Sequence, residues 1–271
     1  MAEAIIRGLI ETGRTVPAQL VAVNHQNHAR LQSLKNRYGI RIAESPDKRK
    51  AEIQSADIVV LAMKPKDAGK ALTEIRPLIS ERQLIISVIA GLSIDTIASH
   101  LPDHVSIVRT MPNTSSTIGC GATGIAFSTH VTEQEQKEAI EMFEAIGVAV
   151  HVDEPMLDLI TGLSGSGPAY VYYLMEAMIS AATAGGMSKD MAKKLVAQTV
   201  YGAAKMVMET DEEPEVLRNR VTSPGGTTEA ALNLMKERGF PEIVQGAVKR
   251  AAERAKELGE ETKGSFNSIS S

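Results

Sequence analysis

The chain has 271 residues, a formal net charge of −4 and one cysteine, Cys120. Its length predicts two domains, since a domain usually has about 100 to 200 residues. Acidic and basic residues are intermixed without a basic stripe, which argues against a nucleic-acid partner. A single cysteine excludes an internal disulfide and fits a reducing compartment. Because we find neither a membrane-length apolar stretch nor a signal-peptide pattern, we expect a cytoplasmic protein without a membrane partner.

Strand and helix patterns alternate in the first half of the chain. Continuously apolar runs of strand length predict strands that are covered on both faces, as in a parallel sheet. Amphipathic segments bounded by glycine or proline predict the helices between them. The predicted strands are residues 20–23, 57–63, 84–89, 106–109, 121–128 and 148–151, and the predicted helices are residues 2–13, 29–38, 46–55, 66–80, 93–99 and 132–146. This alternation predicts a doubly wound α/β domain over residues 1–152.

From Pro155 onward the apolar residues recur with the 3.6-residue period of a helix. The predicted helices are residues 167–184, 189–209, 228–238 and 241–258. We therefore expect an all-helical domain over residues 153–262, followed by a polar, frayed tail at 263–271. The two central helices are apolar around most of their circumference, more than one small domain can cover. This surplus predicts a partner subunit and an obligate homo-oligomer.

A loop rich in glycine and hydroxyl residues precedes the helix predicted at 228–238. It reads Val-Thr-Ser-Pro-Gly-Gly-Thr-Thr from Val221 to Thr228. Adjacent glycines and a proline at a helix start predict a tight turn with free N–H groups at the positive end of the helix dipole. Such a turn predicts a binding site for a carboxylate or phosphate, although an ordinary turn at the start of a helix has the same composition.

Several motifs, in the same order, resemble the pyrroline-5-carboxylate reductase family over nearly the whole chain. The most specific spans 214–236 and includes the loop 221–228. The others are AMKP at 62–65, SVIAG at 87–91, RTMPNT at 109–114, GSGPAY at 165–170 and GAAKM at 202–206. The resemblance implies a Rossmann-like NAD(P)-binding domain and a helical dimerisation domain, often assembled as a ring of five dimers. It also implies hydride transfer to the C=N carbon of 1-pyrroline-5-carboxylate, which yields L-proline.

The resemblance also implies which residues hold the substrate. The predicted substrate-binding residues are Ser223, Gly225, Gly226, Thr227 and Thr228. Loop N–H groups would hold the substrate carboxylate, and Thr228 would be catalytic by placing its hydroxyl on the ring nitrogen. Because that nitrogen is basic enough to be protonated near neutral pH, the site needs positioning more than a strong acid. The acidic run 211–213 would balance an iminium charge, but a run of acids before a proline is more often a solvated helix end.

In doubly wound folds, ligands bind at the carboxyl ends of the strands. We therefore predict that the loops after several strands converge on the cofactor. The predicted cofactor residues are Asn24, His25, Ala62, Met63, Lys64, Pro65, Ala90, Gly91 and Asn113. Gly91 would allow close backbone approach, and the Asn113 amide offers a donor and an acceptor to the nicotinamide.

The segment after the strand predicted at 20–23 contains no acidic residue. An acid there would bind the ribose 2′-hydroxyl of NAD and repel the 2′-phosphate of NADP. The chain instead has Asn-His-Gln-Asn at 24–27, Arg30 close behind and the basic run 48–50 further on. This composition predicts NADPH as the preferred cofactor, with NADH as the alternative. Relatives often carry an asparagine where this chain has Arg49.

The sequence departs from the family pattern at two places. Relatives begin with a strand and a Gly-x-Gly-x-x-Gly/Ala turn ahead of the helix that starts here at Ala2. We therefore expect the central first strand to be missing and its neighbours to have unpaired edges. An upstream translation start, favoured by the intact motifs, or a damaged or repurposed copy would explain this. The second departure, Arg220, adds a positive charge beside the loop 221–228.

Two other functions share this architecture. An enzyme of the β-hydroxyacid dehydrogenase group would need a lysine early in the long helix, where the chain has Val171. A non-catalytic, oligomerising paralogue would have lost its cofactor together with the first strand, so NADPH binding separates it from the reductase. We assign no metal site, since the histidines at 25, 100, 104 and 151 are too scattered.

Overall fold

The computed structural model describes residues 1–267, and contacts divide them into two compact units. Unit 1 comprises Met1–Ser166 together with the chain from Lys249 onward, and unit 2 is Gly167–Val248. Unit 1 extends past the predicted boundary at 152 because Leu157 and Ile160 pack into its core. The last helix contributes its residues from Lys249 onward to the same unit. That helix continues through Asn267, so residues 263–267 of the predicted tail are helical. Residues 268–271 of that tail lie outside the described residues.

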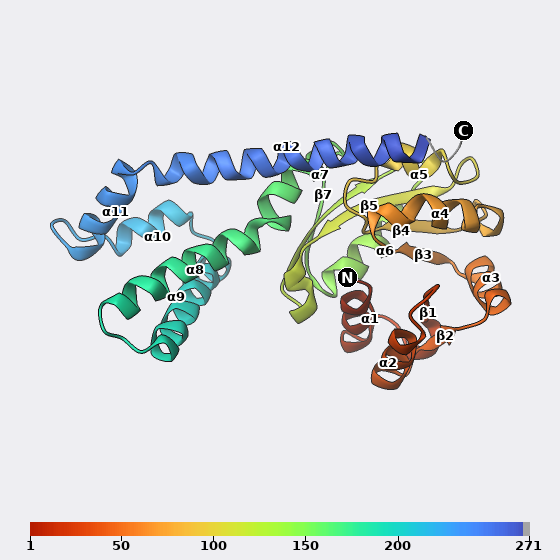
Figure 1. The fold of residues 1–271 in the computed structure, drawn as a ribbon, viewed down its shortest axis with the longest axis horizontal. Helices are drawn as coiled ribbons and strands as arrows, with labels where there is room; N and C mark the ends of the chain where they lie inside the picture. The colour runs from red at the N-terminus through yellow and green to blue at the C-terminus, as the bar shows by residue number, and fades with distance from the viewer. Residues whose placement is uncertain (268–271) are drawn as a thin grey trace. The chain divides into compact units, whose positions relative to one another are not determined.

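Unit 1 contains two separate ladders of strands (Figure 1). Its strands are β1 (Val21–Val23), β2 (Arg41–Ala43), β3 (Ile58–Leu61), β4 (Leu84–Ser87), β5 (Ser106–Pro112), β6 (Gly121–Phe127) and β7 (Gly147–His151). The large sheet has the order β3-β4-β5-β6-β7, and β1 pairs with β2 alone. Within the described residues, β1 and β3 therefore each keep one edge without a strand partner. Such edges are expected of a doubly wound sheet without its first strand.

The large sheet is mixed rather than wholly parallel. β3, β4 and β5 run parallel, whereas β6 is antiparallel to β5 and parallel to β7. The short 3-10 turn Thr114–Ile118 joins β5 to β6, and a connection this short links antiparallel neighbours because a parallel crossover needs a dozen or more residues. β5 extends beyond the predicted 106–109 because its pairing with β6 continues to Pro112. The strand β2 was not predicted, since Ile42 is its one large apolar residue, whereas β1, of the same length, is apolar throughout.

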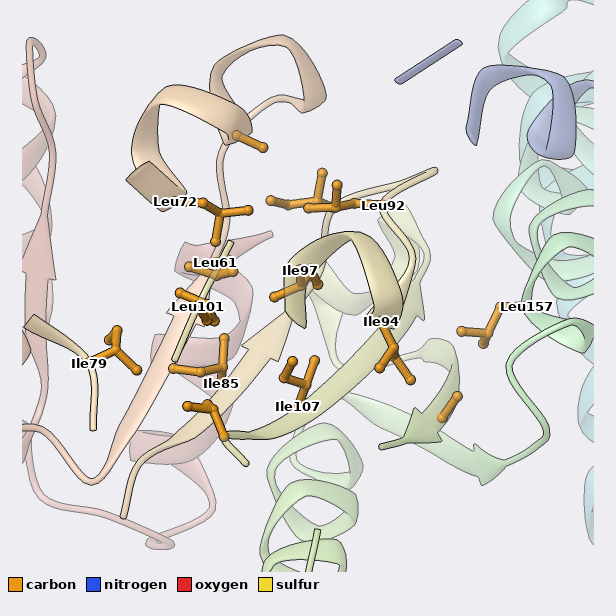
Figure 2. Packing of buried hydrophobic residues seen from close by; sticks show 14 residues of the cluster. Leu61, Leu72, Ile79, Ile85, Leu92, Ile94, Ile97, Leu101, Ile107 and Leu157 are labelled. Atoms are coloured by element: carbon orange, nitrogen blue, oxygen red, sulfur yellow. The ribbon is translucent and has the colours of Figure 1, made fainter. Parts of the chain in front are cut away.

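Helices of unit 1 cover both faces of the large sheet. The helices of its first part are α1 (Ala2–Glu11), α2 (His28–Tyr38), α3 (Pro46–Ser55), α4 (Pro65–Ile75), α5 (Ile94–Ala98), α6 (Glu133–Glu144) and α7 (Met156–Ile160). Of these, α2 and α3 lie against β1 and β2. Successive residues of β4 point into opposite apolar clusters. Ile85 packs with residues of α4, α5 and α7 (Figure 2), whereas Leu84 and Ile86 pack with residues of α1 and α6. Because β4 is covered on both faces, its sequence is apolar at every position but the last.

Unit 2 is helical throughout its regular elements, as predicted. Its helices are α8 (Gly167–Ala184), α9 (Lys189–Thr210), α10 (Pro214–Arg220), α11 (Thr227–Glu237) and the first part of α12 (Phe240–Asn267). The short helix α10 was not predicted, because its seven residues include only two large apolar ones. Within the described residues, none of the helices combines the length and the apolar character needed to cross a lipid bilayer.

The two long helices of unit 2 expose large apolar and aromatic side chains. These are Val171, Tyr172, Tyr173, Leu174, Met191, Leu195, Tyr201, Met206 and Met208. Tyr173 and Met208 are 76% and 78% exposed, although α8 and α9 pack against each other. A patch this large on one helical pair is typical of a surface that another subunit covers.

Candidate active site

Three loops that carry predicted cofactor residues follow adjacent parallel strands of unit 1. Residues 62–65 join β3 to α4, with Pro65 as the first residue of that helix. Ala90 and Gly91 lie between β4 and α5, and Asn113 follows β5. Because β3, β4 and β5 are parallel neighbours, their carboxyl ends meet at one edge of the sheet, as required for a nucleotide site.

The loop 88–93 between β4 and α5 requires a glycine at position 91. Gly91 has a φ of +74°, which side chains rarely tolerate. Ile89 and Leu92 anchor the loop with 1% and 0% exposure, and Ala90 between them is exposed. A Cβ at position 91 would lie 3.3 Å from the backbone of Gly259 in α12. The backbone of α12 thus comes close to Gly91, and the contact of Gly91 with a cofactor stays a prediction.

The Asn113 side chain is bonded at both ends within unit 1. Its Nδ2 donates to the carbonyl oxygen of Ser164 at 3.0 Å, and its Oδ1 accepts from the N–H of Ala122 at 3.3 Å. Ser164 lies in the π-helical turn Thr161–Gly165. π-helical turns are rare and occur frequently at functional sites. These bonds shape the end of β5, so a direct contact of Asn113 with the nicotinamide stays a prediction.

At the carboxyl end of β1, Asn24 organises the backbone of the following turn. Its Oδ1 accepts from the N–H groups of Gln26 and Asn27 at 3.0 and 2.8 Å. Asn27 in turn caps α2 by accepting from the N–H of Arg30. The carbonyl oxygen of Asn24 accepts a hydrogen bond of 3.3 Å from Nη1 of Arg49. Arg49, on α3, is therefore the basic residue that reaches this end of β1.

Arg30, the other basic candidate, is engaged elsewhere. Its guanidinium pairs with Glu3 of α1, which also binds Arg37 and the hydroxyl of Tyr38. Burial alone would raise the pKa of Glu3, but the hydrogen bond from Tyr38 and the charges of Arg30 and Arg37 outweigh it and lower the pKa below 4.5. Glu3 stays ionised at neutral pH and holds the guanidinium of Arg30 at α1, although it shares its single charge with Arg37.

In unit 2, the loop 221–228 has the predicted tight turn and helix start. The N–H of Gly226 donates to the carbonyl oxygen of Ser223 at 2.9 Å, and Gly225 has a φ of +73°. Proline before such a glycine defines a type II turn. A Cβ at position 226 would lie 2.9 Å from the Ser223 oxygen. Both glycines are therefore required, and they deliver the chain to α11 at Thr227.

A carboxylate of the chain itself already binds this loop. Oε2 of Glu229 accepts a hydrogen bond of 2.7 Å from the N–H of Gly225. Glu229 occupies the third position of α11, from which a carboxylate can reach back to the turn. The remaining N–H groups of the first helical turn have no partner within a helix and point along the positive end of its dipole. They are the donors that an anionic ligand would use.

The positive charge predicted beside the loop 221–228 is paired within the chain. Both terminal nitrogens of the Arg220 guanidinium donate to the carboxylate of Glu212, each at 2.6 Å. Such a bidentate pair balances both charges. Arg220 therefore adds little net charge beside the loop, and Glu212 in the acidic run 211–213 is not free to balance an iminium.

A sheet of this topology, with loops at one carboxyl edge and an all-helical second unit, is typical of nucleotide-dependent oxidoreductases that have a helical association domain. Two family models match the chain: NADP oxidoreductase, coenzyme F420-dependent, over residues 1–91, and pyrroline-5-carboxylate reductase dimerisation over residues 154–258. The second match contains α8, α9 and the loop 221–228.

Known proteins are similar in sequence to almost the whole chain. Pyrroline-5-carboxylate reductase 1 of Bacillus spizizenii is 42% identical over 96% of this chain and 87% of its own length. The Escherichia coli pyrroline-5-carboxylate reductase is 37% identical over 95% and 94%. The solved pyrroline-5-carboxylate reductase of Coxiella burnetii has a TM-score of 0.89 and 35% identity, over 95% of this chain and 94% of its own. The chain belongs to the pyrroline-5-carboxylate reductase family.

Proposed function

We propose that this chain reduces 1-pyrroline-5-carboxylate to L-proline with NADPH. The observation that supports this most is the type II turn at 223–226, which leads into α11 inside the dimerisation segment of a chain 42% identical to a named reductase. A solved relative from Plasmodium falciparum, 29% identical with a TM-score of 0.81, has NADP bound. Both competing functions lack such support. Position 171, where the β-hydroxyacid dehydrogenase group needs a lysine, is Val171 on α8.

The chain's residues have separate tasks in this proposal. When bound, NADPH would supply the hydride that reduces the C=N bond. The first-turn N–H groups of α11 hold the substrate carboxylate, since the positive end of a helix dipole favours an anion. Thr228, at the second position of α11, directs its hydroxyl to the ring nitrogen of the protonated imine. Hydride addition to the carbon leaves the C=N electron pair on that nitrogen, which takes a proton from water to become the secondary ammonium of proline. The loops at 62–65 and 88–93, with Asn113, hold the nicotinamide and its ribose.

The direct test is to mix the purified chain with NADPH and 1-pyrroline-5-carboxylate, and to follow the loss of nicotinamide absorbance together with the formation of proline. We expect NADPH oxidation with equimolar proline. NADPH binding without turnover would contradict the assigned substrate. Absence of both binding and turnover would favour a non-catalytic paralogue.

Arg49 is proposed to select NADPH over NADH. Its guanidinium lies against the end of β1, where the ribose 2′-position binds in doubly wound folds. Replacing Arg49 with alanine is expected to raise the KM for NADPH about tenfold, since a hydrogen bond to a charged group is lost, and to leave the KM for NADH unchanged. Steady-state kinetics with both cofactors measures this. The matched control is Lys48→Ala, which removes the same charge from an exposed neighbour. Equal effects of the two variants would exclude a specific role of Arg49.

The assembly that we propose is a homodimer formed through α8 and α9. The dimerisation family match and the exposed apolar side chains of these helices support it. A ring of five dimers is the larger assembly implied by the family resemblance. We also propose that the protein acts in the cytoplasm, because a free, exposed Cys120 fits a reducing compartment.

A further inference from the structure

Two consecutive residues of β5 hold both ends of the loop 88–93. At the loop's start, Thr110 donates its hydroxyl to the carbonyl oxygen of Ser87 at 3.0 Å, and both residues are buried. At its end, the N–H of Ile94 donates to Oε1 of Glu154 at 2.8 Å. Nη1 of Arg109, which precedes Thr110, donates to that same carboxylate oxygen at 3.0 Å. The loop is thus tied to β5 directly at one end and through a carboxylate at the other.

The hydrogen bond from Ile94 to Glu154 fixes the end of the loop 88–93. Ile94 is the first residue of α5, so its N–H has no partner within that helix. The side chain of Arg109 is only 11% exposed, and its other terminal nitrogen lies 3.6 Å from Oδ1 of Asp158. Of the two acids, only Glu154 has a hydrogen bond to the end of the loop. A charge-assisted bond to a buried arginine fixes the carboxylate, and the carboxylate fixes the loop.

We propose that Glu154, held by Arg109, is a positioning residue for the cofactor loop 88–93. It acts by setting the position of Ala90 and Gly91 and touches neither substrate nor cofactor. This inference rests on the proposed function, in which Ala90 and Gly91 contact the nicotinamide end of NADPH. Because the loop is anchored by buried side chains at Ile89 and Leu92, loss of the Glu154 bond frees its end without unfolding the sheet.

The test compares Glu154→Ala with the matched control Asp158→Ala, which removes the other carboxylate beside Arg109 but no bond to the loop. Glu154→Ala is expected to raise the KM for NADPH about tenfold, with kcat at saturating NADPH within about threefold of the parent. Asp158→Ala is expected to keep the parent KM. Glu154→Gln, which keeps an acceptor oxygen for the Ile94 N–H, is expected to recover most of the affinity. A KM within twofold of the parent for Glu154→Ala, or an equal rise for Asp158→Ala, overturns the proposal.

Amide hydrogen exchange, measured without cofactor, reports the local stability of the loop 88–93 independently of catalysis. Glu154→Ala is expected to speed amide exchange over residues 88–94, relative to Asp158→Ala at matched thermal stability. Unchanged exchange in this segment overturns the positioning role whether or not the enzyme is active. If the parent chain neither binds NADPH nor reduces the imine while exchange changes as expected, the proposed function fails and the structural role of Glu154 stands.

Discussion

Replacing Thr228 with valine is expected to lower kcat for 1-pyrroline-5-carboxylate by about 100-fold, since the hydroxyl positions the ring nitrogen and misplaced reacting atoms cost about that much in rate. Valine preserves the shape of threonine but lacks its hydroxyl. Thr228 is the second residue of α11 and is partly buried. The substitution changes only the side chain, so the backbone N–H that we propose for binding the substrate carboxylate is kept. We therefore expect the KM for NADPH to stay unchanged. Steady-state kinetics with each substrate varied in turn measures both quantities.

Serine at position 228 is the control, because it returns the hydroxyl without the methyl group. Thr228→Ser is expected to recover most of the lost kcat. If valine and serine lower kcat equally, the methyl group rather than the hydroxyl matters, and the assigned hydrogen bond to the ring nitrogen is wrong. An unchanged kcat in Thr228→Val would remove Thr228 from the catalytic role altogether.

Local sequence patterns predicted the elements whose burial is regular. β4 is apolar on consecutive positions because both faces are covered, and that pattern is visible in the sequence without knowledge of its neighbours. The turn at 223–226 was likewise predictable, since a positive φ at position 225 requires glycine. The direction of β6 was not predicted, because β5 was expected to end at Arg109, which left nearly the dozen residues that a parallel crossover needs. The pairing of β5 with β6 continues to Pro112 and shortens that connection.

The contacts that organise the candidate site were less accessible from the sequence. Arg109 and Glu154 stand far apart in the chain, and no periodicity marks either as the holder of a loop. The sequence also could not distinguish Arg30 from Arg49 at the end of β1, because the partner that holds Arg30 is Glu3, on another helix. Gly91 was predicted to approach a cofactor, and the neighbour found is the backbone of Gly259. Contacts between residues far apart in the chain depend on the fold and cannot be read from neighbouring positions in the sequence.

Introducing charge on the apolar face of unit 2 is expected to abolish dimer formation. The double variant Leu174→Glu and Leu195→Glu places one carboxylate on α8 and one on α9, at side chains that are 39% and 54% exposed in the single chain. In a twofold dimer each substitution occurs twice, and burying each unpaired charge costs several kcal/mol. We expect the mass in solution, measured by light scattering during size-exclusion chromatography, to fall from that of an oligomer to that of one chain.

The matched control is Ile118→Glu, which places the same charge on an apolar side chain that is 72% exposed but lies in unit 1, outside the dimerisation segment 154–258. This variant is expected to keep the mass of the parent. Circular dichroism at the working temperature separates dissociation from unfolding, since a dissociated but folded chain keeps its helical signal. An unchanged mass in the double variant would place the dimer contact elsewhere and leave the exposed apolar residues of α8 and α9 without a partner.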